Sequence, residues 1–344
     1  MTSPDTGKPR TTLAEVARAA GVSLATASKV VNGRPDVALE TRAKVEEAIR
    51  GLQYSGRTRK QEQGRQSVAF LADVINSPYA MEVLRGAVLA AEELDVDVVV
   101  ERTHQGDGPD TETLLTQRLL SRGRSGAIVL TSGVSKQDYA KLIRARLPMV
   151  VVDPLESSHP DVTSIGSTNW MGGRSVAEHL ISLGHERIGI ISGPAKSLSA
   201  MARLDGLLSA WAQAGKDPQA ARVEHVAFDA AAADTVAAGW LRSEHRPTAI
   251  ATGSDAQAMG VLQAAREAGL TVPDDLSIVG YDDTALAALA TPPLTVVRQP
   301  LADMGAHAMA TVLGMARGEP PSSQHIEIAT SLVVRSSTAP PRRD

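Results

Sequence analysis

The sequence predicts an all-α head near the N-terminus, followed by an α/β body made of two lobes with parallel sheets. Residues 12–52 hold three short helical patterns separated by turn signals, and from Ser67 onward short apolar runs alternate with helical patterns. The charge divides at the same point, because residues 1–66 hold twelve Lys or Arg against seven Asp or Glu and the remainder holds 23 against 32. A basic head on an acidic body indicates either a polyanionic partner for the head or a charged, solvated tail.

The composition excludes several classes of protein. The 344 residues leave room for two or three domains, and 43% of them are apolar, as in ordinary globular proteins. The absence of cysteine excludes disulfides, thiolate metal sites and a cysteine nucleophile. No run approaches the roughly 20 apolar residues of a membrane span, and the stretch MTSPDTGKPRTT lacks the apolar run of a signal peptide. We therefore expect a cytoplasmic protein with no membrane partner.

The first helical pattern lies in TLAEVARAAG, residues 12–21. Thr12 and Glu15 have the spacing of a capping box, and Gly21 is expected to end the helix. One apolar stripe is formed by Leu13, Val16, Ala17 and Ala20.

Two further helices are expected in GVSLATASKVVNG and VALETRAKVEEAIRGLQY. Ser23 can cap the second helix, which should run to about Asn32, and the third should cover residues 39–52. The predicted buried positions are Ala27, Val30 and Val31 in the second helix and Val45, Ala48, Ile49 and Leu52 in the third. Three short helices, the first two joined by a tight turn, form a helix-turn-helix unit.

The second helix has one side that suits DNA better than a protein core. In a helix-turn-helix unit this helix enters the major groove, so its outward side chains must be short or able to hydrogen-bond. Polar and basic side chains can reach bases or phosphates, and Leu24 and Ala25 offer apolar contact to thymine methyl groups. Arg34, Thr41 and Arg42 would hold the DNA backbone. A small three-helix bundle for protein contact is the alternative.

Residues 11–54 carry a family resemblance. TLAEVARAAGVSLATASKVVNG followed by VALETRAKVEEAIRGLQY resembles the DNA-binding domain of the lactose-repressor (LacI/GalR) family of bacterial transcription regulators. The resemblance implies that Leu24 and Ala25 choose the operator sequence and that Ser28, Lys29 and Asn32 are recurrent DNA-contact positions. The complete expected DNA-binding set is Thr12, Leu13, Ser23, Leu24, Ala25, Thr26, Ser28, Lys29, Asn32, Arg34, Thr41 and Arg42.

The hinge, residues 55–66, departs from the family pattern. Most members have a short helix there, whose leucine wedges into the minor groove and kinks the DNA. This chain has SGRTRKQEQGRQ, with Gln63 at the leucine position. We expect weak or absent wedging, and a flexible basic linker that contacts only phosphates is an equally simple interpretation.

The body, residues 67–338, predicts two parallel sheets with helices on both faces. Apolar runs such as VAFLADV, GAIVLTS, PMVVVD, RIGIIS, TAIATG and LSIVGYD indicate about ten strands. Helices are expected around 79–94, 110–122, 136–146, 170–183, 199–214, 255–269 and 300–316. In such folds a ligand binds at the carboxyl ends of the strands, between the sheets.

Carboxylates and hydroxyls follow several of these strands. They suit a ligand with many hydroxyl groups, because carboxylates accept hydrogen bonds from hydroxyls, Arg203 and Asn169 donate, and aromatic rings stack on C–H faces. Aspartate at a strand end is equally typical of a helix cap. The expected effector-binding set is Asp73, Tyr79, Asp153, Trp170, Arg203, Phe228, Ser254, Asp255 and Asp282.

The resemblance continues through the body to about residue 338, in SIGSTNWMGG, HLISLGHERIGIISGP, SLSAMARLDGLLSA, TGSDAQAMG, LSIVGYDD and PPLTVVRQPLADMG. It implies the fold of periplasmic sugar-binding proteins, with Arg203 and Asp282 as the pair that clamps the effector, Ser254 as a polar sugar contact and Asp153 on the opposing lobe. Lobe one is expected to hold residues 67–164 and 294–324, and lobe two residues 165–293 and 325–338.

An enzyme is not favoured. The chain lacks GxGxxG, GxxxxGK[ST], HExxH and GxSxG, and its eight histidines show no metal-ligand spacing, so we expect no metal, no cofactor and a structural role for His185. The adjacent Asp282 and Asp283 should point apart, which argues against a catalytic dyad.

These features together predict a homodimeric repressor that binds a pseudo-palindromic operator and is released by a mono- or oligosaccharide. The C-terminal RSSTAPPRRD has no apolar heptads, so a tetramerising coiled coil like that of the lactose repressor is not expected there. Two alternatives stay open: a regulator that needs a nucleobase-like corepressor to bind DNA, and a sugar-binding protein without DNA-binding activity.

Overall fold

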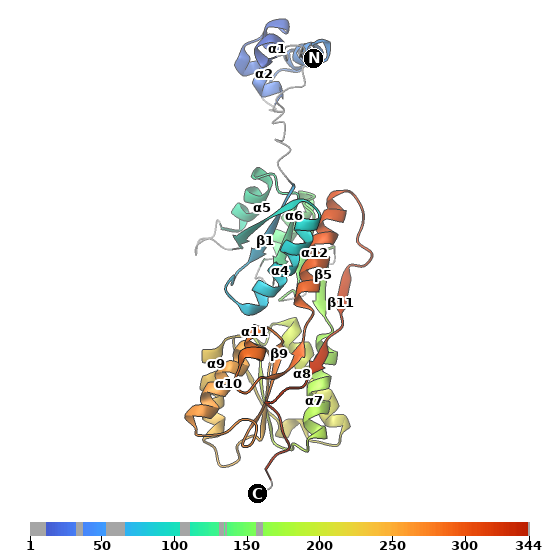
Figure 1. Ribbon diagram of the computed structural model, residues 1–344. Coiled ribbons are helices and arrows are strands. Elements are labelled where there is room, and N and C mark those ends of the chain that lie inside the picture. Colours follow the sequence, from blue (N-terminus) through green and yellow to red (C-terminus); the bar gives the residue numbers. More distant parts are fainter. Residues whose placement is uncertain are drawn as a thin grey trace, which may run out of the picture. The chain divides into compact units, whose positions relative to one another are not determined.

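The computed structural model describes residues 12–31, 37–52, 66–103, 111–130, 134, 136–155 and 161–342. The chain forms two compact units that divide after Arg65, and Figure 1 shows both. In the described ranges, every helix is too short or too polar to cross a membrane.

The first unit contains three helices, α1 (Leu13–Ala19), α2 (Leu24–Val31) and α3 (Leu39–Gly51). The capping box is confirmed: the Glu15 amide donates to Thr12 Oγ1, and the Thr12 amide donates to Glu15 Oε2 at 2.6 Å. Ser23 caps α2 by accepting from the Thr26 amide at 3.1 Å. The small core is formed by Val16, Ala17, Ala27, Val30 and Val45, with Leu13, Ala20, Ala48 and Ile49 packed against it.

Leu52 differs from its predicted burial. It is exposed, because α3 ends at Gly51 and Leu52 lies in the turn beyond the helix. The side chain of Val31 lies outside the described residues, as do Asn32, Arg34 and the hinge.

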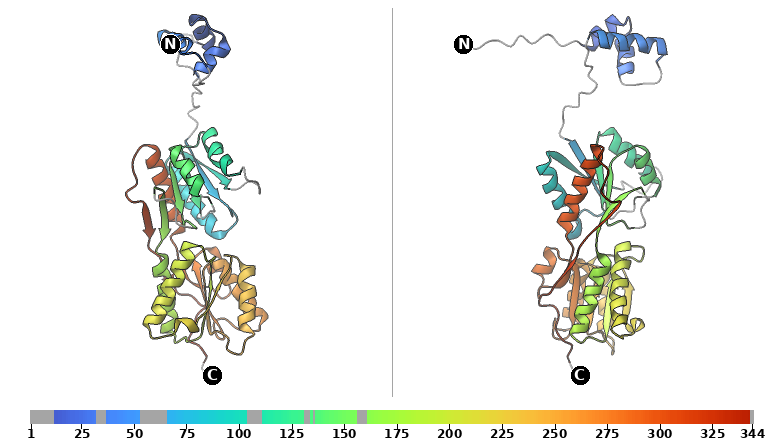
Figure 2. Two further views of the ribbon diagram at one scale, coloured as in Figure 1. Left: turned by 180° about the vertical axis from the view of Figure 1, so that it is seen from behind. Right: turned by 90° about the vertical axis from the view of Figure 1, so that its right-hand side faces the viewer.

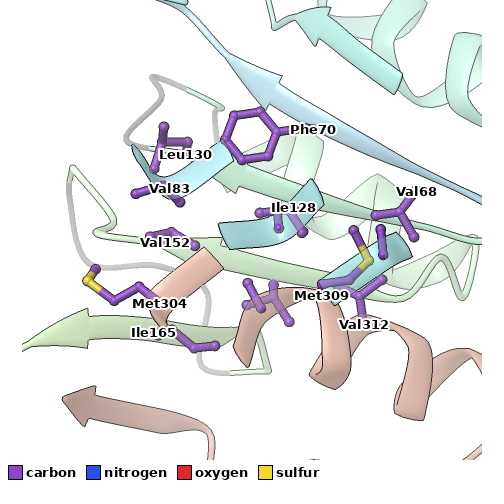
Figure 3. Close-up of a cluster of buried hydrophobic side chains, with 14 of the residues drawn as sticks. Val68, Phe70, Val83, Ile128, Leu130, Val152, Ile165, Met304, Met309 and Val312 are labelled. Atoms are coloured by element: carbon purple, nitrogen blue, oxygen red, sulfur yellow. The ribbon is translucent and has the colours of Figure 1, made fainter. Parts of the chain in front are cut away.

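The second unit contains two six-stranded sheets, and the first sheet is entirely parallel. Its strands, from one edge to the other, are β11 (His325–Ile328), β5 (Thr163–Ser167), β4 (Met149–Val152), β3 (Gly126–Leu130), β1 (Gln66–Ala72) and β2 (Val96–Arg102). One face is covered by α4 (Pro78–Glu93) and α12 (Leu301–Ala316), and the other by α5 (Thr111–Ser121) and α6 (Lys136–Arg144). Figure 3 shows Met304, Met309 and Val312 of α12 in the core against this sheet.

The second sheet is parallel except for one edge strand. Its strands are β12 (Ser331–Val333, antiparallel to its neighbour), β10 (Thr295–Arg298), β9 (Ser277–Asp282), β8 (Ala249–Thr252), β6 (Ile188–Ser192) and β7 (Arg222–His225). One face carries α7 (Asn169–Ser182) and α8 (Leu198–Gln213); the other carries α9 (Ala230–Leu241), α10 (Asp255–Glu267) and α11 (Ala285–Leu289). A 3-10 turn, η1 (Pro218–Ala220), precedes β7. Figure 2 shows the helices on both sides of this sheet.

The lobe boundaries differ from those expected. β5 continues to Ser167 and β11 begins at His325, and both belong to the first sheet. β10 belongs to the second sheet, although residues 294–324 were expected in lobe one. The chain therefore crosses between the sheets after Ser167, Arg298 and Ile328. Strand pairing decides these points, and the short sequences TSIGS, TVVR and HIEI do not reveal their partners.

Candidate DNA-binding face and ligand site

Helix α2 has the two sides that the sequence predicts. Ala27 and Val30 are buried in the head core, whereas Leu24 is 55% exposed and Ala25 and Lys29 are also exposed. The outward side of this helix is therefore available to a partner, while its inward side holds the three helices together.

The other predicted DNA-binding residues among those that the structure describes are exposed or half-buried. Ser23 is exposed and Thr26 is half-buried, and their hydroxyl groups are 2.8 Å apart. Ser28 is half-buried. At the helix starts, Thr12 is exposed, and Leu13, Thr41 and Arg42 are half-buried. Because Ser23 also caps α2, it orients the helix whether or not it contacts DNA.

In the second unit, Arg203 of α8 lies at the centre of a buried polar cluster. It is only 8% exposed. Its Nε donates to Asn169 Oδ1 at 2.8 Å, and its Nη1 donates to the Gly253 carbonyl at 2.6 Å. The guanidinium lies over the Tyr281 ring, 3.9 Å from the centroid, a cation–π contact that further fixes its position.

Asp282 ends β9 and faces this guanidinium. Its Oδ1 lies 3.9 Å from Arg203 Nη1 and accepts from Gln299 Nε2 at 2.6 Å. Its φ of 110° lies in the left-handed region, which is strained for a residue with a side chain. Burial raises the pKa of Asp282, while Arg203 and Gln299 oppose that rise.

Asp153 approaches from the first sheet, directly after β4. It is 6% exposed, and Tyr79 Oη of α4 donates to its Oδ2 at 2.5 Å. Burial raises its pKa, and the positive charge of Arg203 and the Tyr79 hydrogen bond act in the opposite direction. Carboxylates from both lobes therefore interact electrostatically with the Arg203 guanidinium.

Ser254 and Asp255 start α10, the role that the sequence left as an alternative. Ser254 Oγ accepts from the Gln257 amide at 3.2 Å. Asp255 Oδ2 accepts from the amide and hydroxyl of Thr284, but its Oδ1, also buried, has no hydrogen-bond partner among the described residues. Burial, followed by the charge of Asp282, raises the pKa of Asp255.

Two aromatic residues of the predicted effector-binding set, Phe228 and Trp170, differ in their exposure and in their neighbours. Phe228 is half-buried, and its ring packs closely against Gly193. A Cβ atom added to Gly193 would lie only 2.0 Å from Phe228 Cζ. Its centroid is 6.0 Å from Arg203 Cζ, so the ring belongs to the cluster. Trp170 is 39% exposed, with Arg174 6.0 Å from its ring centroid. Asp73 is half-buried in the loop after β1.

Three members of the cluster were not predicted from the sequence: Ser167, Tyr281 and Gln299. Ser167 Oγ donates to Gln299 Oε1 at 2.6 Å, and both residues are buried. Gln299 follows β10, a strand that no apolar run indicated. Tyr281 was the neighbour of a predicted residue, but alternation along a strand normally sends neighbours to opposite faces.

The remaining charged candidates have structural partners. Asp283 bonds Arg298 and Arg335, each at 2.6 Å, whereas Asp282 bonds Gln299, so the two carboxylates point apart as predicted. His185 is fully buried between Thr248 and the Ala339 carbonyl, and burial lowers its pKa to about 4. Within the described ranges, no group of three or more His, Asp or Glu side chains could hold a metal ion.

Comparison with known proteins agrees with this architecture. The family of bacterial regulatory proteins of the lacI type matches residues 12–56, and the periplasmic binding protein-like domain matches residues 177–338. The chain is 33% identical to the HTH-type transcriptional regulator MalR of Streptomyces coelicolor, over 96% of this chain and 97% of the relative.

Two solved structures share the fold across almost the whole chain. The complex of the regulator CelR with cellobiose has a TM-score of 0.70 at 28% identity and covers 95% of this chain and 100% of its own. The Lac repressor dimer bound to operator and the anti-inducer ONPF also has a TM-score of 0.70 at 28% identity, covering 96% and 100%. With a helix-turn-helix head, two periplasmic-binding-protein-like lobes and this similarity along its length, the chain belongs to the lacI family of DNA-binding transcriptional regulators.

Proposed function

We propose that this regulator represses carbohydrate-utilisation genes and that a small, uncharged sugar releases it from its operator. The observation that carries the proposal is the buried guanidinium of Arg203, which faces Asp282 on its own lobe and acts electrostatically on Asp153 of the other. A polar ligand held by these three side chains would contact both lobes.

The chemistry of the cluster favours a sugar. Sugar hydroxyls both donate and accept, so they match carboxylates and a guanidinium together, and the Phe228 ring offers a face for C–H groups. Two buried carboxyl groups, Asp282 and Asp153, act on one guanidinium, and a third, Asp255, is buried close to Asp282. A phosphorylated or acidic sugar would add negative charge to this low-dielectric surrounding, which is unfavourable. The similarity to CelR in complex with cellobiose also supports a neutral saccharide.

The head supplies the DNA contacts in this proposal. The exposed side of α2, with Leu24, Ala25 and Lys29, enters the major groove, and apolar contacts supply much of the sequence readout. Two copies of the chain form a homodimer on a pseudo-palindromic operator, supported by the similarity to the operator-bound Lac repressor dimer. The protein acts where bacterial DNA lies, in the cytoplasm, and performs no catalytic step.

The sugar controls DNA binding through the two lobes. It can shift the equilibrium only by the difference between its affinities for the two states of the body. Gln63, at the expected wedge position in the hinge, leaves little apolar surface to insert between base pairs, so we propose that the operator is bent less than by a leucine wedge.

A gel-shift titration tests the proposal. The full-length protein is titrated against the promoter fragment of its own gene, alone and with cellobiose, maltose, ribose, glucose or glucose 6-phosphate. We expect salt-sensitive retardation that a neutral sugar weakens and glucose 6-phosphate does not. Retardation that appears only when a nucleobase is added would instead establish the corepressor alternative. No salt-sensitive retardation of any fragment would contradict repression altogether.

A further inference from the structure

Arg203 and Asp282 are joined by more than their ion pair. Each side chain is also tied by hydrogen bonds to the segment in which the chain first crosses between the lobes, where β5 ends and α7 begins. Arg203 Nε donates to Asn169 Oδ1 at 2.8 Å, and Asn169 Nδ2 donates to the Ser167 carbonyl at 3.1 Å.

The second connection runs through Gln299. Ser167 Oγ donates to Gln299 Oε1 at 2.6 Å, and Gln299 Nε2 donates to Asp282 Oδ1 at 2.6 Å. With the 3.9 Å ion pair, these bonds close a ring of five residues, in which Ser167 takes part through both its hydroxyl and its backbone carbonyl. We call it the clamp ring: Ser167, Asn169, Arg203, Asp282 and Gln299.

Every member of the clamp ring is buried, with an exposed fraction of 8% or less. In such a place water does not readily replace a lost partner, so an unmade hydrogen bond costs its full desolvation energy. If one member loses a hydrogen bond, we therefore expect its neighbour in the ring to adjust, because water does not take the place of the lost partner.

The segment Ser167–Asn169, in the first crossing, is hydrogen-bonded to each of the other two crossings. Thr168 lies between Ser167 and Asn169, and its Oγ1 accepts from the Thr330 amide at 2.9 Å and lies 3.0 Å from Thr330 Oγ1. Thr330 belongs to the crossing between β11 and β12. Gln299 itself lies in the crossing that leaves β10. Residues 167–169 therefore join the three connections between the lobes through side-chain hydrogen bonds.

We propose that Gln299 and Asn169 are positioning residues that couple the occupancy of Arg203 and Asp282 to the crossings between the lobes. The coupling rests on the proposed function, because it concerns the route by which a bound sugar changes the body. A ligand hydroxyl that donates to Asp282 competes with Gln299 for the carboxylate, and Gln299 in turn holds Ser167 at the end of β5. The ring thus connects Arg203, through Asn169, and Asp282, through Gln299, to the same segment, residues 167–169.

The first test needs no ligand. Ser167→Ala and Asp282→Ala are made singly and together, and unfolding free energies are measured by urea denaturation. We expect the folding equilibrium constants to be non-additive by about three- to tenfold, the equivalent of one hydrogen bond, because the Ser167 hydroxyl that Ser167→Ala removes is connected to Asp282 through Gln299. The same cycle in the Gln299→Met background should be additive. If Asp282→Ala fails to fold, Asp282→Asn replaces it.

Ser337→Ala is the matched control. Ser337 is also a fully buried serine, and its Oγ donates to the Ile278 carbonyl at 2.6 Å, but it lies outside the clamp ring. Its cycle with Asp282→Ala should be additive. Non-additivity as large for Ser337 as for Ser167, or additivity for Ser167, would overturn the proposal.

The second test measures transmission with cellobiose as the first probe and the other sugars of the gel-shift panel after it. The ratio of DNA dissociation constants with and without the sugar should fall about three- to tenfold in Ser167→Ala and Gln299→Met, with sugar affinity in Ser167→Ala nearly unchanged. A purely structural residue would not lower this ratio. If the variants leave this ratio of DNA dissociation constants unchanged, the coupling is contradicted. If DNA binding of the wild type responds to no sugar, the proposed function is contradicted. In that case the ligand-free mutant cycle of Ser167 and Asp282 still tests the coupling.

Discussion

The head and the body place their functional side chains in opposite surroundings. On α2 the side chains that face outward are exposed, and the core of the head is formed by other residues of the same helix. In the body the predicted clamp residues Arg203, Asp282 and Asp153 are each less than a tenth exposed and are held by hydrogen bonds. In the head, a substitution can therefore weaken DNA binding without lowering stability. In the body, a substitution in the ligand site is expected to change stability as well.

The largest expected effect lies in the body. Arg203→Met removes a buried charge. It leaves Asp282 without its ion-pair partner, and Asn169 Oδ1 and the Gly253 carbonyl without the hydrogen bonds that Arg203 donates. We expect the unfolding free energy to fall by about 3 kcal/mol, as measured by urea denaturation. The control is Arg85→Met, since Arg85 forms an exposed ion pair with Glu82 and its loss should cost under about 0.5 kcal/mol. Equal losses for both variants would show that the cluster does not stabilise the fold.

A pH-dependent effect follows at Asp255. Its pKa is raised to about 8 by burial and by Asp282, so the folded state binds more protons than the unfolded state between about pH 4 and about pH 8, and stability falls as the pH rises through this range. Asp255→Asn keeps an acceptor for Thr284 and removes the titration. We expect it to be more stable than the wild type at pH 8, by about 2 kcal/mol, and no more stable at pH 4. Thermal unfolding at both pH values measures this difference, and a gain that is the same at both would contradict it.

Much of this contrast could be predicted from the sequence, because exposed recognition and helix capping are local properties. The capping box of Thr12 and Glu15, the two sides of α2 and the apolar runs of the central strands all follow from residue spacing. The pairing of the short strands β5, β10 and β11 depends on distant partners, so the lobe boundaries differed from those expected. α9 was not predicted because AAAADTVAAGWL offers small residues on every side and little contrast between faces.

Prediction of the ligand site from the sequence was limited in the same way, because some of its contacts join distant segments. Arg203, Asp282 and Asp153 were expected from their positions after strands or from the resemblance, but Gln299 and Ser167 enter the cluster only because two crossings lie side by side. Ser254 was expected as a ligand contact, and its hydroxyl caps α10. Side chains that contact across 132 positions of sequence leave no local pattern to detect.

The head should show a loss of recognition without a loss of stability. Lys29→Ala is expected to weaken operator binding about tenfold and to lower the slope of log affinity against log salt, by about 1 if Lys29 contacts a phosphate. Its unfolding free energy should match that of Lys44→Ala, an exposed lysine of α3 that pairs with Glu40. Fluorescence anisotropy at several salt concentrations provides the measurement. Comparable weakening by Lys44→Ala would show that total charge, rather than the α2 face, determines affinity.

The smallest expected effect concerns the aromatic ring. Phe228→Leu keeps apolar volume near Gly193 and Gly253 but removes the flat face beside Arg203. We expect sugar affinity to fall by about three- to tenfold, with DNA affinity in the absence of sugar unchanged. Isothermal titration calorimetry measures the first quantity, and Trp170→Leu serves as the comparison because that ring is more exposed. A larger loss for Trp170→Leu would place the stacking face on α7 instead.

The most direct test measures operator dissociation constants over a titration with a neutral sugar, up to the concentration that saturates the wild type, in the wild type and in Asp153→Asn. We expect the sugar to weaken DNA binding of the wild type by about fivefold or more, within the usual range of allosteric coupling. Asp153→Asn should bind DNA normally and respond only at higher sugar concentration, since it alters the contact from the first lobe and leaves the head unchanged. DNA binding that is insensitive to every neutral sugar in the wild type, or a normal response in Asp153→Asn, would contradict the claim that the buried cluster controls the head.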